Sequence, residues 1–223
     1  MKIINVAIDG PAGAGKSTIS RKAAAELGFI YIDTGALYRT VGLNALRKGA
    51  DINDAESVVA TLTDDLKVEL KFVDGEQRMF LCGEDVSDKI RTPEVSSAAS
   101  KTSAVPEVRK FLFDLQKQLA RENNCIMDGR DIGTVVLPDA DVKIFLTASP
   151  EARAERRYLE LKEKGMDVKY EDVLSDMIKR DYDDSHRAIA PLKQADDAVL
   201  ADTSGNTLEE SIELILSIIK ERL

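Results

Sequence analysis

One eight-residue motif near the amino terminus constrains this 223-residue chain more than any other feature. Gly10–Ser17 reads GPAGAGKS and fits the pattern G-x-x-x-x-G-K-[ST] at every fixed position. The apolar run Ile3–Ile8 precedes it, and a helical pattern formed by Ile19, Ala23 and Leu27 follows it. A glycine-rich turn between a buried strand and a helix is typical of a phosphate-binding loop in an α/β fold.

The chemistry of this loop explains its residue types. Glycines allow the backbone N–H groups to curl around a phosphate, and the following helix adds the positive end of its dipole. Lys16 can reach the β- and γ-phosphates, and the Ser17 hydroxyl can ligate Mg²⁺. We therefore predict a nucleoside triphosphate site made by Gly10, Pro11, Ala12, Gly13, Ala14, Gly15, Lys16, Ser17 and Thr18.

Short apolar runs alternate with longer helical patterns along the rest of the chain. The later runs are Phe29–Ile32, Cys125–Met127, Val142–Leu146 and Ala198–Ala201. We expect helices at about 36–48, 106–122, 150–164, 170–184 and 208–221, with Gly28 and Gly49 ending two helices. This alternation predicts a parallel sheet covered by helices on both faces.

One segment departs from this pattern. Residues 66–72 alternate apolar and charged side chains with a period of two, and a turn around Asp74-Gly75-Glu76 leads to the apolar Met79–Cys82. We interpret 66–87 as a small inserted antiparallel sheet. The alternative is a hairpin that decorates the edge of the main sheet.

Composition excludes several function classes. The 40 acidic and 31 basic residues give a net charge of −9, and such a field repels nucleic acids. No run approaches 18 apolar residues, so we expect a cytoplasmic protein that binds neither nucleic acid nor membrane. The single His186 and the distant Cys82 and Cys125 disfavour a zinc site or a His-based catalytic group, and we expect both thiols to be reduced and buried.

Arginines indicate what the triphosphate is used for. Arg39 follows the second predicted strand and Arg130, in the sequence DGRDIG, follows the third, where open parallel sheets bind ligands. Further arginines are Arg153, Arg156 and Arg157 at one helix start, and Arg180 and Arg187 around 181–184. The chain has no N-K-x-D guanine motif and no strand ending in Asp-Glu, which disfavours a GTPase or a motor ATPase. A small-molecule kinase fits best, and a nucleotide-dependent switch protein is the alternative from another class.

The acidic residues near these arginines allow more than one reading. Asp128 ends a predicted strand and could either orient Mg²⁺ through water or cap the following turn. Asp184 could orient Arg180 and Arg187 or a ribose, whereas we expect Asp181 and Asp183 to face solvent.

Five segments together resemble the bacterial cytidylate kinases, a family of P-loop nucleoside monophosphate kinases. They are Gly10–Thr18, Asp33–Arg39, Ile90–Thr92, Asp128–Val136 and Arg187–Leu192. The resemblance implies phosphoryl transfer from ATP to CMP or dCMP, which yields ADP and the diphosphate. It also implies a single kinase domain over 1–223 with a three-layer P-loop α/β fold, a five-stranded parallel sheet, a monophosphate-binding region at about 34–109 and a lid at about 153–168. We expect a monomer.

The resemblance assigns roles to individual residues. The acceptor nucleotide would be bound by Thr34, Tyr38, Arg39, Ser100, Arg109, Gly129, Arg130, Asp131, Arg180, Asp184 and Arg187. Arg153 and Arg157 of the lid would join the ATP site, and the catalytic group would be Lys16, Arg130, Arg157 and Arg180. Mg²⁺ would be held by Ser17, with phosphate and water oxygens completing its shell. A kinase for AMP, UMP or dTMP is the rival, and only the hairpin and the Ser100 and Arg109 positions separate it.

Overall fold

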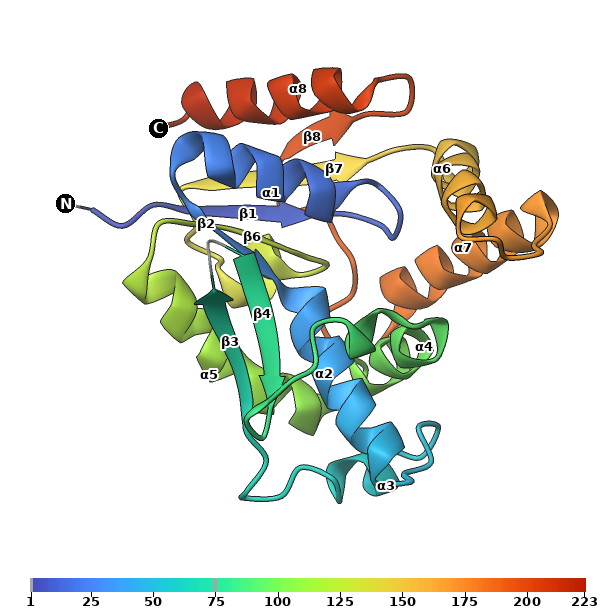
Figure 1. Ribbon diagram of the computed structural model, residues 1–223. Helices are drawn as coiled ribbons and strands as arrows, with labels where there is room; N and C mark the ends of the chain where they lie inside the picture. Colours follow the sequence, from blue (N-terminus) through green and yellow to red (C-terminus); the bar gives the residue numbers. More distant parts are fainter. Residues whose placement is uncertain (1, 74–75) are drawn as a thin grey trace. The chain divides into compact units, whose positions relative to one another are not determined.

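The computed structural model describes residues 2–73 and 76–223 and divides the chain into two compact units (Figure 1). The first unit contains the residues up to 31 together with 122–223, and the second contains 32–121. Within the described residues, no helix is both long and apolar enough to cross a membrane.

A five-stranded sheet organises the first unit. Its strands are β1 (Asn5–Asp9), β2 (Ile30–Asp33), β6 (Cys125–Gly129), β7 (Val142–Thr147) and β8 (Val199–Asp202). They lie in the order β2-β6-β1-β7-β8; β1 pairs in parallel with β6 and β7, and β7 pairs in parallel with β8. The last two residues of β2 belong to the second unit. The predicted five-stranded parallel sheet is confirmed.

Two helices cover one face of this sheet. In Figure 1, α1 (Lys16–Leu27) and α8 (Leu208–Lys220) lie side by side along it. Ile19 of α1 and Ile215 of α8 pack with Ile8, Ile126 and Ile144 of the strands in one buried cluster. The apolar residues of the two helices leave water when they pack on the sheet, and this burial of hydrocarbon stabilises the attachment of the helices.

A helical pair completes the first unit. It consists of α6 (Pro150–Glu163) and α7 (Tyr170–His186). Ala154 and Leu161 of α6 pack against Val173 and Met177 of α7, so the pair has a small core of its own. The residues 162–167 at the turn between the helices are exposed.

The second unit is built around α2 (Thr34–Arg47), which packs against α4. Its other elements are α3 (Ala55–Val59), β3 (Val68–Val73), β4 (Glu76–Leu81), β5 (Glu84–Asp85), η1 (Lys89–Arg91), α4 (Pro93–Thr102) and α5 (Pro106–Glu122), whose last residue belongs to the first unit. The three strands form a separate antiparallel sheet. The inserted sheet is thus confirmed and the edge-hairpin alternative is wrong. Of the predicted turn, Asp74 and Gly75 lie outside the described residues.

Several features of the second unit differ from the expectations, and the unpredicted short helix α3 is one of them. The short helix α4 was not expected, although Thr92 caps it by accepting from the Val95 N–H and Pro93 occupies its first turn. Cys82 is exposed rather than buried, because it lies in the turn between β4 and β5 with a φ of 49°. Cys125 is buried in β6, and both thiols are free.

The end of β1 places the phosphate loop. Gly10 follows Asp9 with a φ of 152°, and a Cβ at Gly10 would lie 1.9 Å from the Leu146 carbonyl oxygen of β7. Only glycine fits this approach, so the loop leaves the sheet in close contact with β7.

Asp9, the last residue of β1, connects this strand to the segment that follows β6. Its carboxylate is 4% exposed and accepts the N–H groups of Ile132 and Gly133, each at 2.7 Å. These two residues begin η2 (Ile132–Val136), a single π-helical turn after β6. Burial raises the pKa of the Asp9 carboxyl to about 6, although the two N–H bonds lower it. A buried carboxylate at the end of β1 therefore holds the start of the segment that follows β6.

This burial predicts a pH-dependent stability. Between its ordinary pKa of 3.8 and about 6, native Asp9 holds a proton that the unfolded chain releases, so its effect on the unfolding free energy becomes less favourable as pH rises through this window. Asp9→Asn lacks this titration. We expect the unfolding free energy of the wild type minus that of Asp9→Asn to fall by about 2 kcal/mol from pH 4.5 to 7.5, measured by urea unfolding. A difference that stays constant with pH would contradict this.

Candidate functional site

The phosphate loop lies at the carboxyl end of β1 and leads directly into α1. Gly15 precedes the helix in a left-handed conformation, and no side chain of the described residues caps the helix N-terminus. Gly13, Ser17 and Thr18 are exposed, whereas Lys16 is 7% exposed. Among the described residues, no side chain takes the position that an anion would occupy at the first N–H groups of α1.

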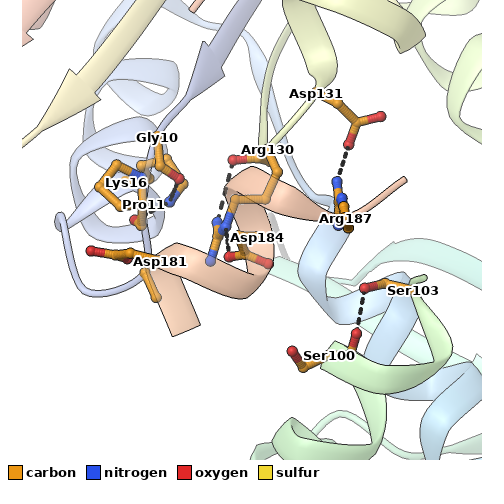
Figure 2. A network of polar contacts seen from close by, with 12 residues as sticks. Gly10, Pro11, Lys16, Ser100, Ser103, Arg130, Asp131, Asp181, Asp184 and Arg187 are labelled. Atoms are coloured by element: carbon orange, nitrogen blue, oxygen red, sulfur yellow. Dashed lines mark hydrogen bonds and ion pairs between the residues drawn. The ribbon is translucent and has the colours of Figure 1, made fainter. Parts of the chain in front are cut away.

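Lys16 points back into its own loop. Its Nζ donates to the Gly10 and Pro11 carbonyl oxygens, both at 2.8 Å (Figure 2). Burial, together with the nearby Arg130, lowers the pKa of Lys16 to about 7, against the attraction of acidic neighbours that include Asp128. A phosphate arriving beside this ammonium group would favour its protonated form.

Ser17 lies against an acidic residue of β6. Its Oγ donates to Asp128 Oδ2 at 3.0 Å, and the Tyr31 hydroxyl donates to Asp128 Oδ1 at 3.2 Å. A hydroxyl beside a carboxylate offers the hard oxygen atoms that Mg²⁺ prefers. The described residues contain no group of three or more His, Cys, Asp or Glu side chains placed to hold a metal. Asp128 therefore contacts Ser17, the predicted magnesium ligand.

Two arginine–carboxylate pairs lie beyond β6 (Figure 2). Arg130 Nε donates to Asp184 Oδ2 at 2.8 Å, and Arg187 Nη2 donates to Asp131 Oδ1 at 3.3 Å. Burial alone would raise the pKa of Asp184, but Arg130, Arg180 and Arg187 together hold it below its ordinary value. The structure thus brings together five of the predicted acceptor-site residues, with Arg180 exposed on α7.

The two predicted ATP-site arginines of α6 differ in their surroundings. Arg157 is half-exposed and its Nη1 donates to Glu160 Oε2 on the same helix at 2.7 Å. Arg153 is buried, and its Nε and Nη1 donate to the Ala148 and Ala12 carbonyl oxygens at 2.8 and 2.9 Å. Arg153 therefore touches the phosphate loop through protein acceptors.

Asp181 is the other partner of Arg153. Its two carboxylate oxygens accept from Arg153 Nη1 at 3.0 Å and from Nη2. The expectation that Asp181 faces solvent is wrong, because α7 turns it toward α6. Asp183 is exposed, as expected.

Of the remaining acceptor-site candidates, Gly129 ends β6 in the first unit, where its carbonyl oxygen accepts from Arg130 Nη1 at 3.3 Å. The others lie in the second unit, and α2 carries three of them. Asp33 caps α2 by accepting from the Ala36 N–H at 2.9 Å, and its second oxygen accepts from Arg39 Nη2 at 2.8 Å. Arg39 Nε is buried and has no hydrogen-bond partner among the described residues. Thr34 is buried at the first position of the helix, and Tyr38 is partly exposed one turn later.

Arg109 of α5 contacts Tyr38 and the end of α4, the helix that carries Ser100. Its guanidinium lies 5.6 Å from the centre of the Tyr38 ring, and its Nη1 donates to the Ser103 carbonyl oxygen at 3.2 Å. The Ser103 hydroxyl in turn donates to the Ser100 carbonyl oxygen at 2.8 Å (Figure 2). Arg109 is thus oriented by an aromatic ring and by the end of α4, the helix that carries Ser100.

Two residues next to the predicted site were missed from the sequence. Asp9 precedes the motif directly, and its signal is an acidic residue at the end of an otherwise apolar strand. Asp181 lies three residues before Asp184, and its signal is the helical spacing that puts both on one face of α7.

The family model for cytidylate kinase matches residues 6–221. The curated cytidylate kinase of Caldicellulosiruptor bescii is 52% identical over 218 residues, which are 98% of this chain and 96% of that protein. The curated cytidylate kinase of Carboxydothermus hydrogenoformans is 48% identical over 218 residues, 97% of each chain.

A solved structure shares the fold at much lower identity. It is an uncharacterized protein from Eubacterium ventriosum, with a TM-score of 0.56 and 14% identity over 99% of this chain and 100% of that one. This similarity supports the fold, whereas the full-length matches at about half identity bear on the family. The chain belongs to the cytidylate kinase family.

Proposed function

We propose that this protein transfers the γ-phosphoryl group of ATP to CMP and dCMP, yielding ADP and CDP or dCDP. The observation that carries the proposal is that the family match spans nearly the whole chain, including the phosphate loop, Arg130 and Arg187. Relatives at about half identity over the same span carry the name cytidylate kinase.

The reaction requires positioning and charge stabilisation rather than a covalent intermediate. In the proposed site, Lys16 and the N-terminus of α1 bind the β- and γ-phosphates of ATP. Arg130 and Arg180 neutralise charge on the phosphoryl group during transfer, and Arg157 reaches it from the lid. Asp184 holds the Nε of Arg130, which fixes the plane of that guanidinium before the substrates arrive.

The proposed cofactor is Mg²⁺, which when bound would neutralise charge on the phosphate oxygens. Ser17 would hold the ion through its hydroxyl oxygen. The Ser17 hydroxyl donates a hydrogen bond to Asp128, which leaves the lone pairs of its Oγ available to a metal ion. The oxygen-only character of this pair fits magnesium.

The residues predicted for the acceptor site have different proposed roles. Arg130, Asp131, Arg180, Asp184 and Arg187 would take its phosphate and sugar, with Gly129 beside them, and Thr34, Tyr38 and Arg39 would complete the grip. Cytosine exposes an amino donor and the N3 and O2 acceptors. Arg109 would donate to these acceptors, and Ser100 or Asp131 would accept from the amino group.

Closure over ATP is part of the proposal. The lid, at about 153–168, includes most of α6 and the exposed turn before α7. The small apolar core shared by α6 and α7 would allow the pair to move as one body when it excludes water from the phosphoryl group. We also propose that the enzyme is a monomer.

The first test is an ADP-release assay with ATP, Mg²⁺ and a panel of acceptors. We expect turnover with CMP and dCMP to exceed that with UMP, AMP, GMP and dTMP. In Lys16→Met the loss of one charge-stabilising group should reduce kcat by about a hundredfold or more. Preference for another monophosphate would keep the chemistry and overturn the base assignment. ATP-induced thermal stabilisation without turnover of any acceptor would favour the switch protein instead.

The low pKa of Lys16 predicts proton uptake when ATP binds. At pH 8 a lysine with a pKa of about 7 is mostly neutral, and the arriving phosphates should raise that pKa and recover the proton. Calorimetric titration with MgATP in buffers of different ionisation enthalpy should show uptake approaching one proton at pH 8 and much less at pH 6. Lys16→Arg stays charged and is the control without uptake. Equal uptake in both proteins would show that another group titrates.

Base selection should depend on Arg109. Arg109→Met removes the proposed donor to cytosine and should lower kcat/KM for CMP by about ten- to a hundredfold, with less effect on the rate with poor acceptors. Arg121→Met is the matched control, since Arg121 is exposed near the end of the same helix. An unchanged ratio of kcat/KM between CMP and UMP in Arg109→Met would refute the assignment.

A further inference from the structure

We propose that Asp181 is a positioning residue for the phosphate loop, acting through Arg153. In this arrangement Asp181 holds the Arg153 guanidinium, Arg153 holds the Ala12 carbonyl, and the loop keeps its backbone N–H groups directed at ATP. The inference rests on the proposed function for the identity of the ligand.

Helix α7 presents two carboxylates one turn apart, and each binds a different arginine. Asp184 binds Arg130, which follows β6, whereas Asp181 binds Arg153 of α6. The side chain of Arg153 is 3% exposed and that of Asp181 is 24% exposed. The Arg153–Asp181 pair is therefore largely removed from water. A hydrogen-bonded ion pair in such surroundings is directional and costly to break.

The donors of Arg153 are almost all occupied. Its Nε donates to the Ala148 carbonyl at the end of β7, and its Nη1 is shared between the Ala12 carbonyl and Asp181. Its Nη2 donates to the second oxygen of Asp181. Four of the contacts that a guanidinium can make with its five N–H groups are thus made to the protein. Such a group is suited to fixing the loop rather than to wrapping a phosphate.

The bond to Ala12 has a consequence for the next amide. In a trans peptide the carbonyl and the following N–H point in opposite directions, so holding the Ala12 oxygen also sets the direction of the Gly13 N–H. The loop has little room to rotate here. Gly13 has a φ of 74°, and a Cβ on it would lie 3.1 Å from Met177 Cε of α7 and 3.4 Å from Arg153 Cβ.

Two effects of removing the Asp181 charge oppose each other. An unpaired Arg153 would attract the phosphates more strongly, which would tighten ATP binding. It would also be a buried cation without its counter-ion, and it would turn toward water or another acceptor and release Ala12. Because Arg153 is held at four points and only the carboxylate neutralises it, we expect the loss of loop geometry to exceed the gain in attraction.

The experiment compares Asp181→Asn with Asp183→Asn. Both variants lose one negative charge on α7, but Asp183 is exposed and carries no role in this proposal. The affinity for the imido analogue of ATP is measured with Mg²⁺, together with kcat and the KM values for ATP and CMP. In Asp181→Asn we expect about tenfold weaker analogue binding and a similar rise in KM for ATP, with KM for CMP changed less than about twofold. Asp183→Asn should match the wild type.

A double variant tests the path through Arg153. Arg153→Met combined with Asp181→Asn should bind the analogue no more weakly than Arg153→Met alone, since both changes remove the same arrangement. Additive losses would overturn the proposal, as would tighter binding by Asp181→Asn or equal affinities of the two Asn variants. Should Asp181→Asn fail to fold, Arg153→Lys carries the test, because lysine cannot span both acceptors. Wild-type analogue affinity in Arg153→Lys would then overturn the proposal.

The readout separates this inference from the proposed function. Binding of the ATP analogue needs no acceptor nucleotide, so it remains informative if the wild type fails to phosphorylate CMP. In that case the kinase assignment fails and the affinities of the variants still decide the role of Asp181. A wild type that does not bind the analogue at all would overturn both.

Discussion

A buried ammonium group governs the arrangement of the first unit. Lys16 lies among protein atoms at the carboxyl end of the sheet, where removing its charge from water carries a large cost. Two carbonyl oxygens of its own loop accept hydrogen bonds from its Nζ, and Asp9, Asp128 and Asp184 supply negative charge around it. Each of these carboxylates is itself tied to another part of the unit. The strand ends β1 and β6 and the helix α7 thus each contribute a carboxylate near the one buried amine.

This charge balance is local, and it runs against the acidity of the whole chain. With a net charge of −9, the protein as a whole repels the nucleotides it is proposed to bind. Arg130, just after β6, and Arg187, just after α7, supply guanidinium groups for the proposed phosphate contacts, and each is paired with a carboxylate. Because each arginine is paired, the site is preorganised without a large unbalanced positive charge, and incoming phosphates compete with carboxylates that already hold the guanidinium planes.

Much of this arrangement could be predicted from the sequence, for physical reasons that differ between elements. The motif 10–17 demands a strand before it and a helix after it, so the central part of the sheet followed from spacing alone. The period-two pattern of 66–72 likewise revealed the second sheet. Helix α4 is too short for a clear apolar period. Cys82 continues the apolar pattern of β4 by one residue, although it lies in the turn after that strand.

The partners of buried charges were harder to foresee. Asp181 and Asp183 are the same residue type on the same helix, and only the packing of α6 against α7 decides that one binds Arg153 while the other faces water. Asp9 reads as a strand end, and its link to η2 requires a π-helical turn that has no sequence signature in 132–136. Spacing can put two carboxylates on one face of a helix, but which arginine each of them binds is a property of the tertiary structure.

The interval between Asp181 and Asp184 also limits how α7 can change in length. A residue inserted between them would rotate everything beyond the insertion by about 100° around the helix axis and shift it by about 1.5 Å. One of the two carboxylates would then leave its arginine, so the register of α7 is read at two points at once. Substitutions on the outer face of α7 leave this register intact, whereas insertions and deletions between the two pairs do not. Both ion pairs therefore require that the spacing between Asp181 and Asp184 stays at about one helical turn.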